Sequence, residues 1–549
     1  MRTTILQIAP RMPTLPQPLP TVRADLQQRL AEAVPYDMAI VGGGATGLGV
    51  ALDATARGLR VVLIDSHDFA QGTSSRSTKL VHGGVRYLAQ GNIGLVQEAL
   101  HERTLLLNNA PYLAQPLPFV MPTYHWWEMP FYGTGLKMYD VLAGRAGLGG
   151  TQLLSRAQTL KHLPTLRPKG LKGGVKYWDG QFNDARLALV LARTAAVQGA
   201  LLVNYCRATG LIHEQGKVAG VICQDQLTGR VFHLHSRCVV NATGVWVDEL
   251  RQKDGAALPG KTGATTPAMV APSQGIHMVV ERQFLNADVA LMVPKTADGR
   301  VLFAVPWLGR VILGTTDTPR HDLARDPLPF PEEVDFILRE SARYLRRAPS
   351  RSDVKSVWVG LRPLVKPVQN EGNNTKALSR EHTVVISRSG MVTVTGGKWT
   401  TYRAMAEDVL DKCIQIGLIP PRQSGRTKTL RLLGTDANAS AIRPLFEAPG
   451  WHSYGSEQDF IRSLPGADDY LCPGLTQAMV RFAARFEYAM TVEDVLARRS
   501  RLLFLDARLA SELAPRVAEI LQEETGASVN VDSFQALAEQ YLLKSHKNL

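Results

Sequence analysis

The sequence has no long hydrophobic run and no clustered cysteines. No stretch of its 549 residues approaches the roughly 18 consecutive apolar residues that a membrane-spanning helix needs. Its five cysteines form no C-x-x-C pair and are odd in number, which argues against a disulfide framework or a thiolate metal site. No histidine pair has zinc-like spacing either. We therefore expect no metal, a reducing compartment and, at most, peripheral contact with a membrane.

Acidic residues are missing from the first 24 positions, which carry three arginines and five prolines. An organellar targeting peptide is an amphipathic helix, and prolines at this density prevent one. The apolar core of a secretory signal is also missing. We therefore predict a disordered leader over residues 1–34. The same absences favour the cytoplasmic face of a bacterial inner membrane over a mitochondrial inner membrane.

Over the whole chain, basic residues outnumber acidic ones, and the formal net charge is +13. An anionic lipid surface or a phosphorylated substrate would explain this excess, and so would a scattered basic surface without a partner. No zinc-finger spacing, helix-turn-helix signal or RNP-type motif supports nucleic acid. We expect no nucleic-acid partner.

A glycine-rich loop follows the first predicted strand, Tyr36–Val41. Gly42, Gly44 and Gly47 fit the pattern G-x-G-x-x-G. A helical pattern then runs through residue 57, and a second strand over residues 60–64 ends at Asp65. Strand, loop, helix, strand and acid in this order predict a dinucleotide-binding βαβ unit, with the diphosphate at the helix N-terminus and the ribose on Asp65.

The loop alone does not choose between NAD and FAD. The segment from Asp65 to Lys79 is rich in small polar residues, including Thr73, Ser74 and Ser75. Such a segment offers hydroxyl and backbone donors to a second phosphate and to a flavin ring, which a nicotinamide enzyme does not require. It therefore favours FAD.

Two long motifs carry a resemblance to a known family. Residues 73–88 (TSSRSTKLVHGGVRYL) and residues 396–408 (GGKWTTYRAMAED) resemble the two signatures of the FAD-dependent glycerol-3-phosphate dehydrogenases, closest to the bacterial respiratory and mitochondrial kind. Residues 497–507 also fit, so that the resemblance extends from Tyr36 to the C-terminal helices.

The resemblance implies an α/β fold. A Rossmann-like FAD-binding domain interleaved with a mixed-sheet substrate domain would occupy residues 35–425, and a C-terminal helical domain residues 426–549. It also implies non-covalent FAD, oxidation of sn-glycerol 3-phosphate to dihydroxyacetone phosphate, and electron transfer to a membrane quinone. A homodimer is a further expectation.

The predicted cofactor-binding residues come from the loop, the polar segment, the two signatures and the small-residue strand end over residues 242–244; by resemblance, Ala208 borders the adenine. The strand before Gly396 ends in two glycines, and a helix begins near Thr400, so its positive dipole end would stabilise negative charge on the reduced flavin. The full set is Gly42, Gly43, Gly44, Thr46, Gly47, Asp65, Thr73, Ser74, Ser75, Lys79, His82, Gly83, Gly84, Ala208, Ala242, Thr243, Gly244, Gly397, Lys398, Trp399 and Thr400.

The substrate needs cations for its phosphate and a base for its C2 hydroxyl. By resemblance, Arg362 and Arg380 bind the phosphate, while Arg86, Tyr87 and Lys398 make further substrate contacts. A histidine on an apolar strand, such as His277, is by itself usually a core residue. The family places its proposed base at this position, so the predicted catalytic residues are His277, Lys398 and Arg362.

Other functions fit parts of the sequence. An oxidase would perform the same chemistry with O2 as acceptor. An amine or amino-acid oxidase of the same broad fold would need a carboxylate clamp instead of a phosphate site. A flavin- or nucleotide-binding protein without catalysis, which uses its basic surface to bind tRNA, would need a continuous basic stripe with exposed aromatics.

Two segments outside the signatures carry structural expectations. Residues 126–132 (WWEMPFY) are dense in aromatics, and they form either an insertion packed on the core or a shallow membrane-dipping segment beside a quinone entrance. Near the C-terminus, Asp506 is a plausible N-cap before a helix over residues 507–514. Pro515 should interrupt this helix, and the helical pattern continues over residues 517–525 to Gly526.

Overall fold

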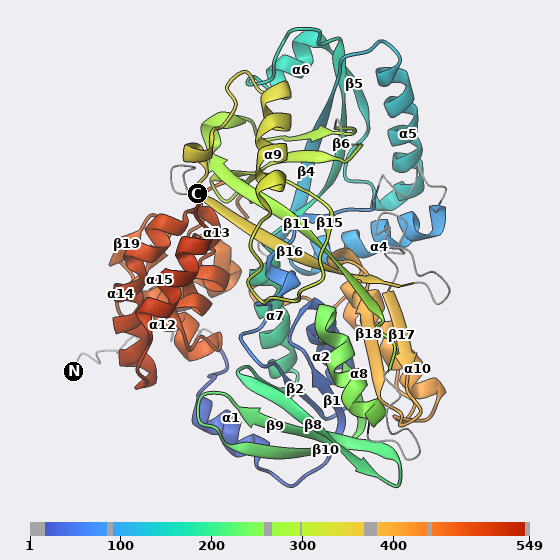
Figure 1. Cartoon of the computed structure of the whole chain (residues 1–549), viewed down its shortest axis with the longest axis vertical. Helices are drawn as coiled ribbons and strands as arrows, with labels where there is room; N and C mark the ends of the chain where they lie inside the picture. Colours follow the sequence, from blue (N-terminus) through green and yellow to red (C-terminus); the bar gives the residue numbers. More distant parts are fainter. Residues whose placement is uncertain are drawn as a thin grey trace, which may run out of the picture.

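Two large sheets and a C-terminal group of helices organise the chain in the computed structural model (Figure 1), which describes residues 17–84, 92–256, 266–296, 299–366, 382–435 and 442–543. Chain segments pass back and forth between the sheets. The predicted interleaving of a cofactor domain with a mixed-sheet substrate domain is therefore confirmed.

The first sheet is the Rossmann-like one. Its order is β17-β18-β10-β1-β2-β7, and β1 lies parallel to both β10 and β2. The β1 and β2 side chains are nearly all buried, as expected for parallel strands covered on both faces. The strands are β1 (Tyr36–Val41), β2 (Val61–Ile64), β7 (Leu201–Val203), β8 (Cys206–Glu214), β9 (Lys217–Asp225), β10 (Val231–Asn241), β17 (His382–Ile386) and β18 (Val392–Gly396), with helices α2 (Ala45–Ala56), α7 (Asp184–Val197), α8 (Val247–Ala256) and α10 (Tyr402–Gln415).

The second sheet is mixed, with antiparallel pairs around one parallel pair, β4 with β12. It forms the upper half of Figure 1. Its strands are β3 (Leu80–Val81), β4 (Ala114–Thr123), β5 (Gln152–Ser155), β6 (Gly173–Phe182), β11 (Val270–Glu281), β12 (Ala290–Val293), β13 (Leu302–Trp307), β14 (Arg310–Gly314), β15 (Thr318–Pro319) and β16 (Ser356–Val365), with helices α4 (Ile93–Asn109), α5 (Glu128–Ala143), α6 (Arg156–His162) and α9 (Pro331–Tyr344).

The C-terminal helices, red in Figure 1, pack against the second sheet. The ring of Phe504 lies 5.0 Å from that of Trp358 on β16, which joins this domain to the substrate sheet. The elements are α11 (Gln458–Arg462), a short π-helix (Asp494–Arg499), α12 (Gln477–Phe486), α13 (Leu502–Leu505), α14 (Ala507–Thr525) and α15 (Val531–Gln540), with the small strands β19 (Tyr470–Cys472) and β20 (Leu475–Thr476). The predicted C-terminal helical domain is confirmed.

The leader differs from its prediction. Helix α1 (Arg23–Leu30) buries Leu26 and Leu30. Arg23 forms an ion pair with Asp225, 2.6 Å between Nη2 and Oδ2, and the Thr21 amide donates to the carbonyl of Arg485 at 2.8 Å. A disordered leader to residue 34 is therefore wrong over this helix, because its apolar side and one arginine have partners far along the chain. Residues 1–16 lie outside the described residues.

No helix in the described parts of the chain is long and apolar enough to cross a membrane.

Candidate active site

The glycine loop of the first sheet leaves no room for side chains. Gly42 has φ +111°, and a Cβ there would lie 2.5 Å from the carbonyl oxygen of Ala242. A Cβ on Gly47 would lie 1.9 Å from the carbonyl oxygen of Gly42. The loop therefore passes close to β10, and the N-terminus of α2 faces an open cavity. This is the arrangement that lets a backbone approach a diphosphate.

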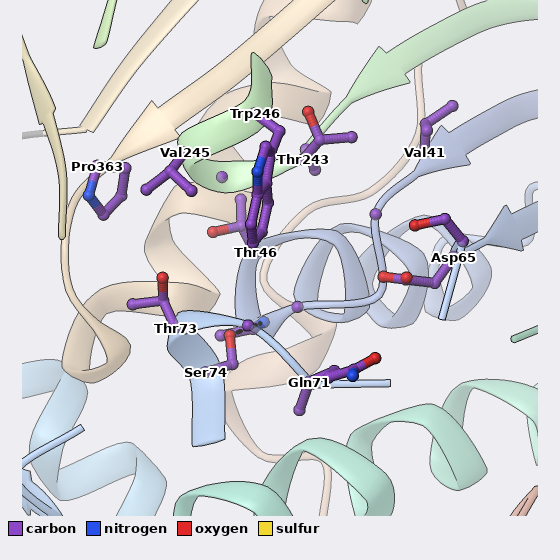
Figure 2. A pocket seen from close by; sticks show the side chains of 18 of the residues that line it. Val41, Thr46, Asp65, Gln71, Thr73, Ser74, Thr243, Val245, Trp246 and Pro363 are labelled. Atoms are coloured by element: carbon purple, nitrogen blue, oxygen red, sulfur yellow. Dashed lines mark hydrogen bonds between the residues drawn. The ribbon is translucent and has the colours of Figure 1, made fainter. Parts of the chain in front are cut away.

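Asp65 follows β2 and lies on the wall of the same cavity (Figure 2). Its carboxylate accepts hydrogen bonds from the amides of Gly43, at 2.6 Å, and His67, at 2.9 Å. Burial raises the pKa of Asp65 to about 6, although these two amides and the charge of Arg325 act in the opposite direction. The carboxylate is thus held in position to accept further hydrogen bonds from ribose hydroxyls.

The cavity brings together most of the predicted cofactor residues from distant parts of the chain. Figure 2 shows Thr73 and Ser74 on the segment that faces α2 across it. Predicted residues that line the cavity are Gly42, Gly44, Thr46, Asp65, Thr73, Ser74, Ala208, Ala242, Thr243, Gly244, Gly397, Lys398 and Trp399.

Other predicted cofactor residues lie behind this wall. Gly43 and Gly47 belong to the loop but face protein, and the amide of His82 donates to Thr400 Oγ1 at 3.2 Å. The amide of Gly83 donates to the hydroxyl of Tyr139 at 2.9 Å. The structure does not bring these residues to the cavity surface, and the same holds for Ser75, Lys79 and Gly84.

Lys79 has a different environment from the predicted one. Its Nζ lies 2.6 Å from Asp184 Oδ2, and the rings of Trp307, Trp358 and Phe504 surround it at 5.2–5.5 Å. Burial lowers the pKa of Lys79 to about 7, while Asp184 opposes that shift. Lys79 therefore holds the polar segment to α7 and to the C-terminal domain rather than reaching into the cavity.

β18 ends at Gly396; Gly396 and Gly397 both have positive φ and line the cavity. A short 3-10 turn, Trp399–Thr401, then leads into α10. The Trp399 indole donates to the carbonyl of Ser74 at 2.9 Å, which joins the second signature to the first. Lys398 and Trp399 line the cavity here, so a helix N-terminus and a cation face the same space.

His277 lies on β11 and is only 2% exposed. Its Nε2 is 2.9 Å from Thr78 Oγ1, and its ring stacks on Trp358 at 5.4 Å between centroids. Burial holds the pKa of His277 well below its ordinary value, and the charges of Lys79 and Arg362 act in the same direction. The imidazole is therefore neutral near pH 7, as a base must be, but neither His277 nor its partner Thr78 lines the cavity.

Arg362 lies on β16 directly before Pro363, which lines the cavity. Its guanidinium donates to the carbonyl of Thr316 at 2.9 Å and lies 3.3 Å from Asp317 Oδ1. Strand pairing places Arg362 opposite Ser273, four residues before His277 on β11. The predicted phosphate ligand and the predicted base are thus on neighbouring strands. Arg86, Tyr87 and Arg380 lie outside the described residues.

Several cavity residues escaped the sequence prediction. Trp246 follows Ala242–Gly244 on the 3-10 turn Gly244–Trp246, and Arg325 comes from an irregular segment before α9. In the sequence, only the position of Trp246, two residues after the small-residue strand end, pointed to the cavity. Nothing in the sequence pointed to Arg325. In the described part of the chain, no group of three metal-ligating side chains forms a metal site.

Comparisons with known proteins agree with this geometry. Residues 37–403 match the model of the FAD dependent oxidoreductase family, and residues 426–530 match that of the C-terminal domain of alpha-glycerophosphate oxidase.

Two curated relatives span most of the chain. Mitochondrial glycerol-3-phosphate dehydrogenase of Bos taurus is 38% identical over 526 residues, which cover 89% of this chain and 70% of that protein. Mitochondrial glycerol-3-phosphate dehydrogenase SDP6 of Arabidopsis thaliana is 39% identical over 532 residues, which cover 89% of this chain and 83% of that protein.

A solved structure, the glycerol-3-phosphate dehydrogenase from Bacillus halodurans complexed with FAD, superposes with a TM-score of 0.74. Its sequence is 30% identical, and the match covers 95% of this chain and 98% of that one. An L-alpha-glycerophosphate oxidase from Mycoplasma pneumoniae, 18% identical with a TM-score of 0.55, shares the fold.

Proposed function

Because the chain belongs to the FAD-dependent glycerol-3-phosphate dehydrogenases, we propose that it oxidises sn-glycerol 3-phosphate to dihydroxyacetone phosphate and passes the electrons to a membrane quinone. The observation that carries the proposal is similarity along nearly the whole chain, combined with a cavity that assembles both signatures. An amino-acid oxidase shares the fold but does not account for that similarity.

The residues of the cavity fit FAD. Gly42 and Gly47 let the loop pack closely against the end of β10, so that the N-terminus of α2 can take a diphosphate from the cavity. Asp65 lies on the wall of the same cavity and is the acceptor for ribose hydroxyls. When bound, FAD supplies the acceptor for a hydride from C2 of the substrate. The N-terminus that follows Gly397, together with Lys398, favours negative charge at that end of the cavity.

The chain's own residues account for the rest of the reaction. The neutral His277 imidazole accepts the proton of the C2 hydroxyl, either directly or through Thr78 Oγ1, with which it is hydrogen-bonded. The C2–H bond breaks with both electrons leaving as hydride, while the O–H electrons form the carbonyl of the product. Arg362 holds the phosphate, and Asp317 and Thr316 hold its guanidinium in place.

The proposed contact with a membrane rests on α5 and the residues just before it. Trp126 is 82% exposed, Phe131 66% and Val141 77%. The opposite side of α5 is buried, and there the hydroxyl of Tyr139 bonds to the Gly83 amide in the first signature. Exposed aromatics beside the site suit a shallow membrane contact near a quinone entrance, with anionic lipid attracted by the chain's positive charge. Attachment to a bacterial inner membrane stays a prediction, as does a homodimer.

The proposal is tested with the purified protein. We expect a flavin absorbance spectrum that bleaches under argon on addition of sn-glycerol 3-phosphate but not of glycerol, and reoxidation by a short-chain quinone. Rapid reoxidation by air, with one H2O2 formed for each substrate and none of the quinone reduced, would identify an oxidase instead. A spectrum that glycerol 3-phosphate leaves unchanged would contradict the proposed substrate.

A further inference from the structure

An irregular segment, residues 320–328, lies between β15 and α9 and contributes Arg325 to the cavity wall; we call it the strap. Both of its ends are fastened. Arg320 donates to the side chain of Gln274 on β11 and to the carbonyl of Leu328 at 2.9 Å. Near the other end, the buried Arg76 forms an ion pair with Asp326 and donates to the carbonyl of Arg325 at 2.9 Å. The strap is thus an ordered part of the substrate domain.

Between these ends the strap meets Trp246. The Trp246 indole donates to the carbonyl of Leu323 at 3.1 Å, and the guanidinium carbon of Arg325 lies 5.2 Å from the centre of the indole ring. Arg325 also donates to Ser66 Oγ at 3.3 Å, immediately after Asp65. Trp246 and Arg325 both line the cavity. Their contact therefore joins the cofactor domain to the strap of the substrate domain at the cavity wall.

The chemistry of this junction suits the adenosine diphosphate half of a dinucleotide. Asp65 marks the ribose position, and the charge of Arg325 is close enough to act on the Asp65 carboxylate. A diphosphate beside them carries negative charge that a guanidinium can bind at any neutral pH. An indole offers a flat apolar surface to the sugar or the base. Arg207 and Lys253 line the same wall, where each forms an ion pair with Glu249.

We propose that Trp246 and Arg325 form a clasp that holds the adenosine diphosphate half of FAD. The cofactor leaves only when the contacts from Trp246 to Leu323 and from Arg325 to Ser66 break. Neither residue belongs to the glycine loop or to the two signatures. The clasp therefore sets the lifetime of bound FAD independently of the groups that carry out the oxidation.

The test measures FAD release. Holoenzyme is diluted, and the fluorescence of freed FAD is followed in time for wild type, Trp246→Ala and Arg325→Gln. Each variant should release FAD at least roughly ten times faster than wild type, since affinity changes at one site are mostly changes in off-rate. For Arg325→Gln, release should also depend less on salt, because a screened charge pair is gone. Arg325→Lys, which keeps the charge, should keep the salt dependence.

The chain offers a matched control. In the C-terminal domain, Arg462 lies over the Trp451 ring at 5.1 Å, away from the cavity. Trp451→Ala and Arg462→Gln remove the same kind of contact and should leave FAD release unchanged.

Release at the wild-type rate from both Trp246→Ala and Arg325→Gln would overturn the clasp, and so would equal acceleration in the control pair. Both results are independent of glycerol 3-phosphate, so the clasp can fail while the proposed reaction stands.

Discussion

At the scale of single residues, Asp65 combines two requirements that oppose each other. It must be a carboxylate to accept hydrogen bonds from ribose hydroxyls, yet burial raises its pKa to about 6 in the FAD-free protein. The folded protein thus favours the protonated acid, and the cost of burying the carboxylate is present above pH 6 and disappears as the pH falls. Bound FAD must therefore displace a proton when the pH is below that value.

We predict that the affinity of the apoprotein for FAD is constant above about pH 6 and falls below it, by up to about tenfold for each pH unit. Fluorescence titration of apoprotein with FAD measures this directly. Asp65→Asn should bind FAD more weakly and without the decline. A wild-type affinity that stays flat to about pH 4 would show that Asp65 is not the ribose acceptor.

His277 yields the second prediction. His277→Asn should keep its flavin but slow flavin reduction by glycerol 3-phosphate roughly 10²–10⁴-fold, the usual effect of losing a general base. Because burial holds the pKa of His277 low, wild-type reduction should not decline on acidification near the ordinary histidine value of about 6.5. Stopped-flow absorbance gives both results. His233→Asn, an exposed histidine on β10, is the control. Reduction of His277→Asn near the wild-type rate would make His277 a core residue.

Arg362 yields the third prediction. Arg362→Ala should weaken transition-state binding of glycerol 3-phosphate by about 3 kcal/mol or more, because charge-assisted bonds to the phosphate are lost. Its weak activity on glycerol should barely change, since glycerol has no phosphate. Steady-state kcat/KM for both substrates makes the comparison. Arg310→Ala is the control, on β14, which lies on the other side of β11 from β16. Equal losses on both substrates would mean that Arg362 supports the fold. The same result is expected for Arg380→Ala.

At the scale of elements, α14 shows which features of a helix can be predicted from its own sequence and which cannot. Asp506 caps the helix as predicted, with its side chain accepting from the Leu509 amide. The predicted interruption at Pro515 is wrong, because α14 continues to Thr525. A proline deprives the carbonyl four residues earlier of its donor. That carbonyl belongs to Ser511, and Gln535 of α15 donates to it at 3.3 Å. A tertiary contact thus makes the proline tolerable, and a single helix pattern cannot reveal it.

The fourth prediction follows from this contact. Gln535→Ala should lower the free energy of unfolding by about 1 kcal/mol, since it leaves the Ser511 carbonyl without its donor. In a Pro515→Ala background, the helix amide supplies that donor again, and Gln535→Ala should cost less. Chemical denaturation of the four proteins measures the coupling. Equal costs in both backgrounds would contradict this account of α14.

At the scale of the whole molecule, the predictable parts of the fold are the local ones. The βαβ unit, the glycine loop and Asp65 all lie within 30 residues of one another, so their order in the sequence was sufficient. The contacts that hold the domains together are not local. Arg499 pairs with Asp68 across 431 residues, and Arg501 donates to the carbonyl of Ser75 across 426. The buried position of Lys79 depends on this same C-terminal domain, which is why its role could not be inferred from its signature alone.

The last prediction concerns how the whole molecule meets a membrane. If the exposed face of α5 dips into lipid, liposomes that contain anionic lipid should bind the protein, and salt should weaken that binding. Trp127→Ser with Phe131→Ser should then reduce liposome binding and quinone reduction together, while reduction of a soluble dye continues, because neither side chain lines the cavity. Leu227→Ser with Val231→Ser, two exposed aliphatic residues near the turn between β9 and β10, is the matched control and should change neither. Cosedimentation with liposomes and parallel assays with quinone and dye separate these effects. A folded, dye-active double variant that stays fully bound to lipid would exclude α5 as the contact and direct attention to the basic C-terminal helices.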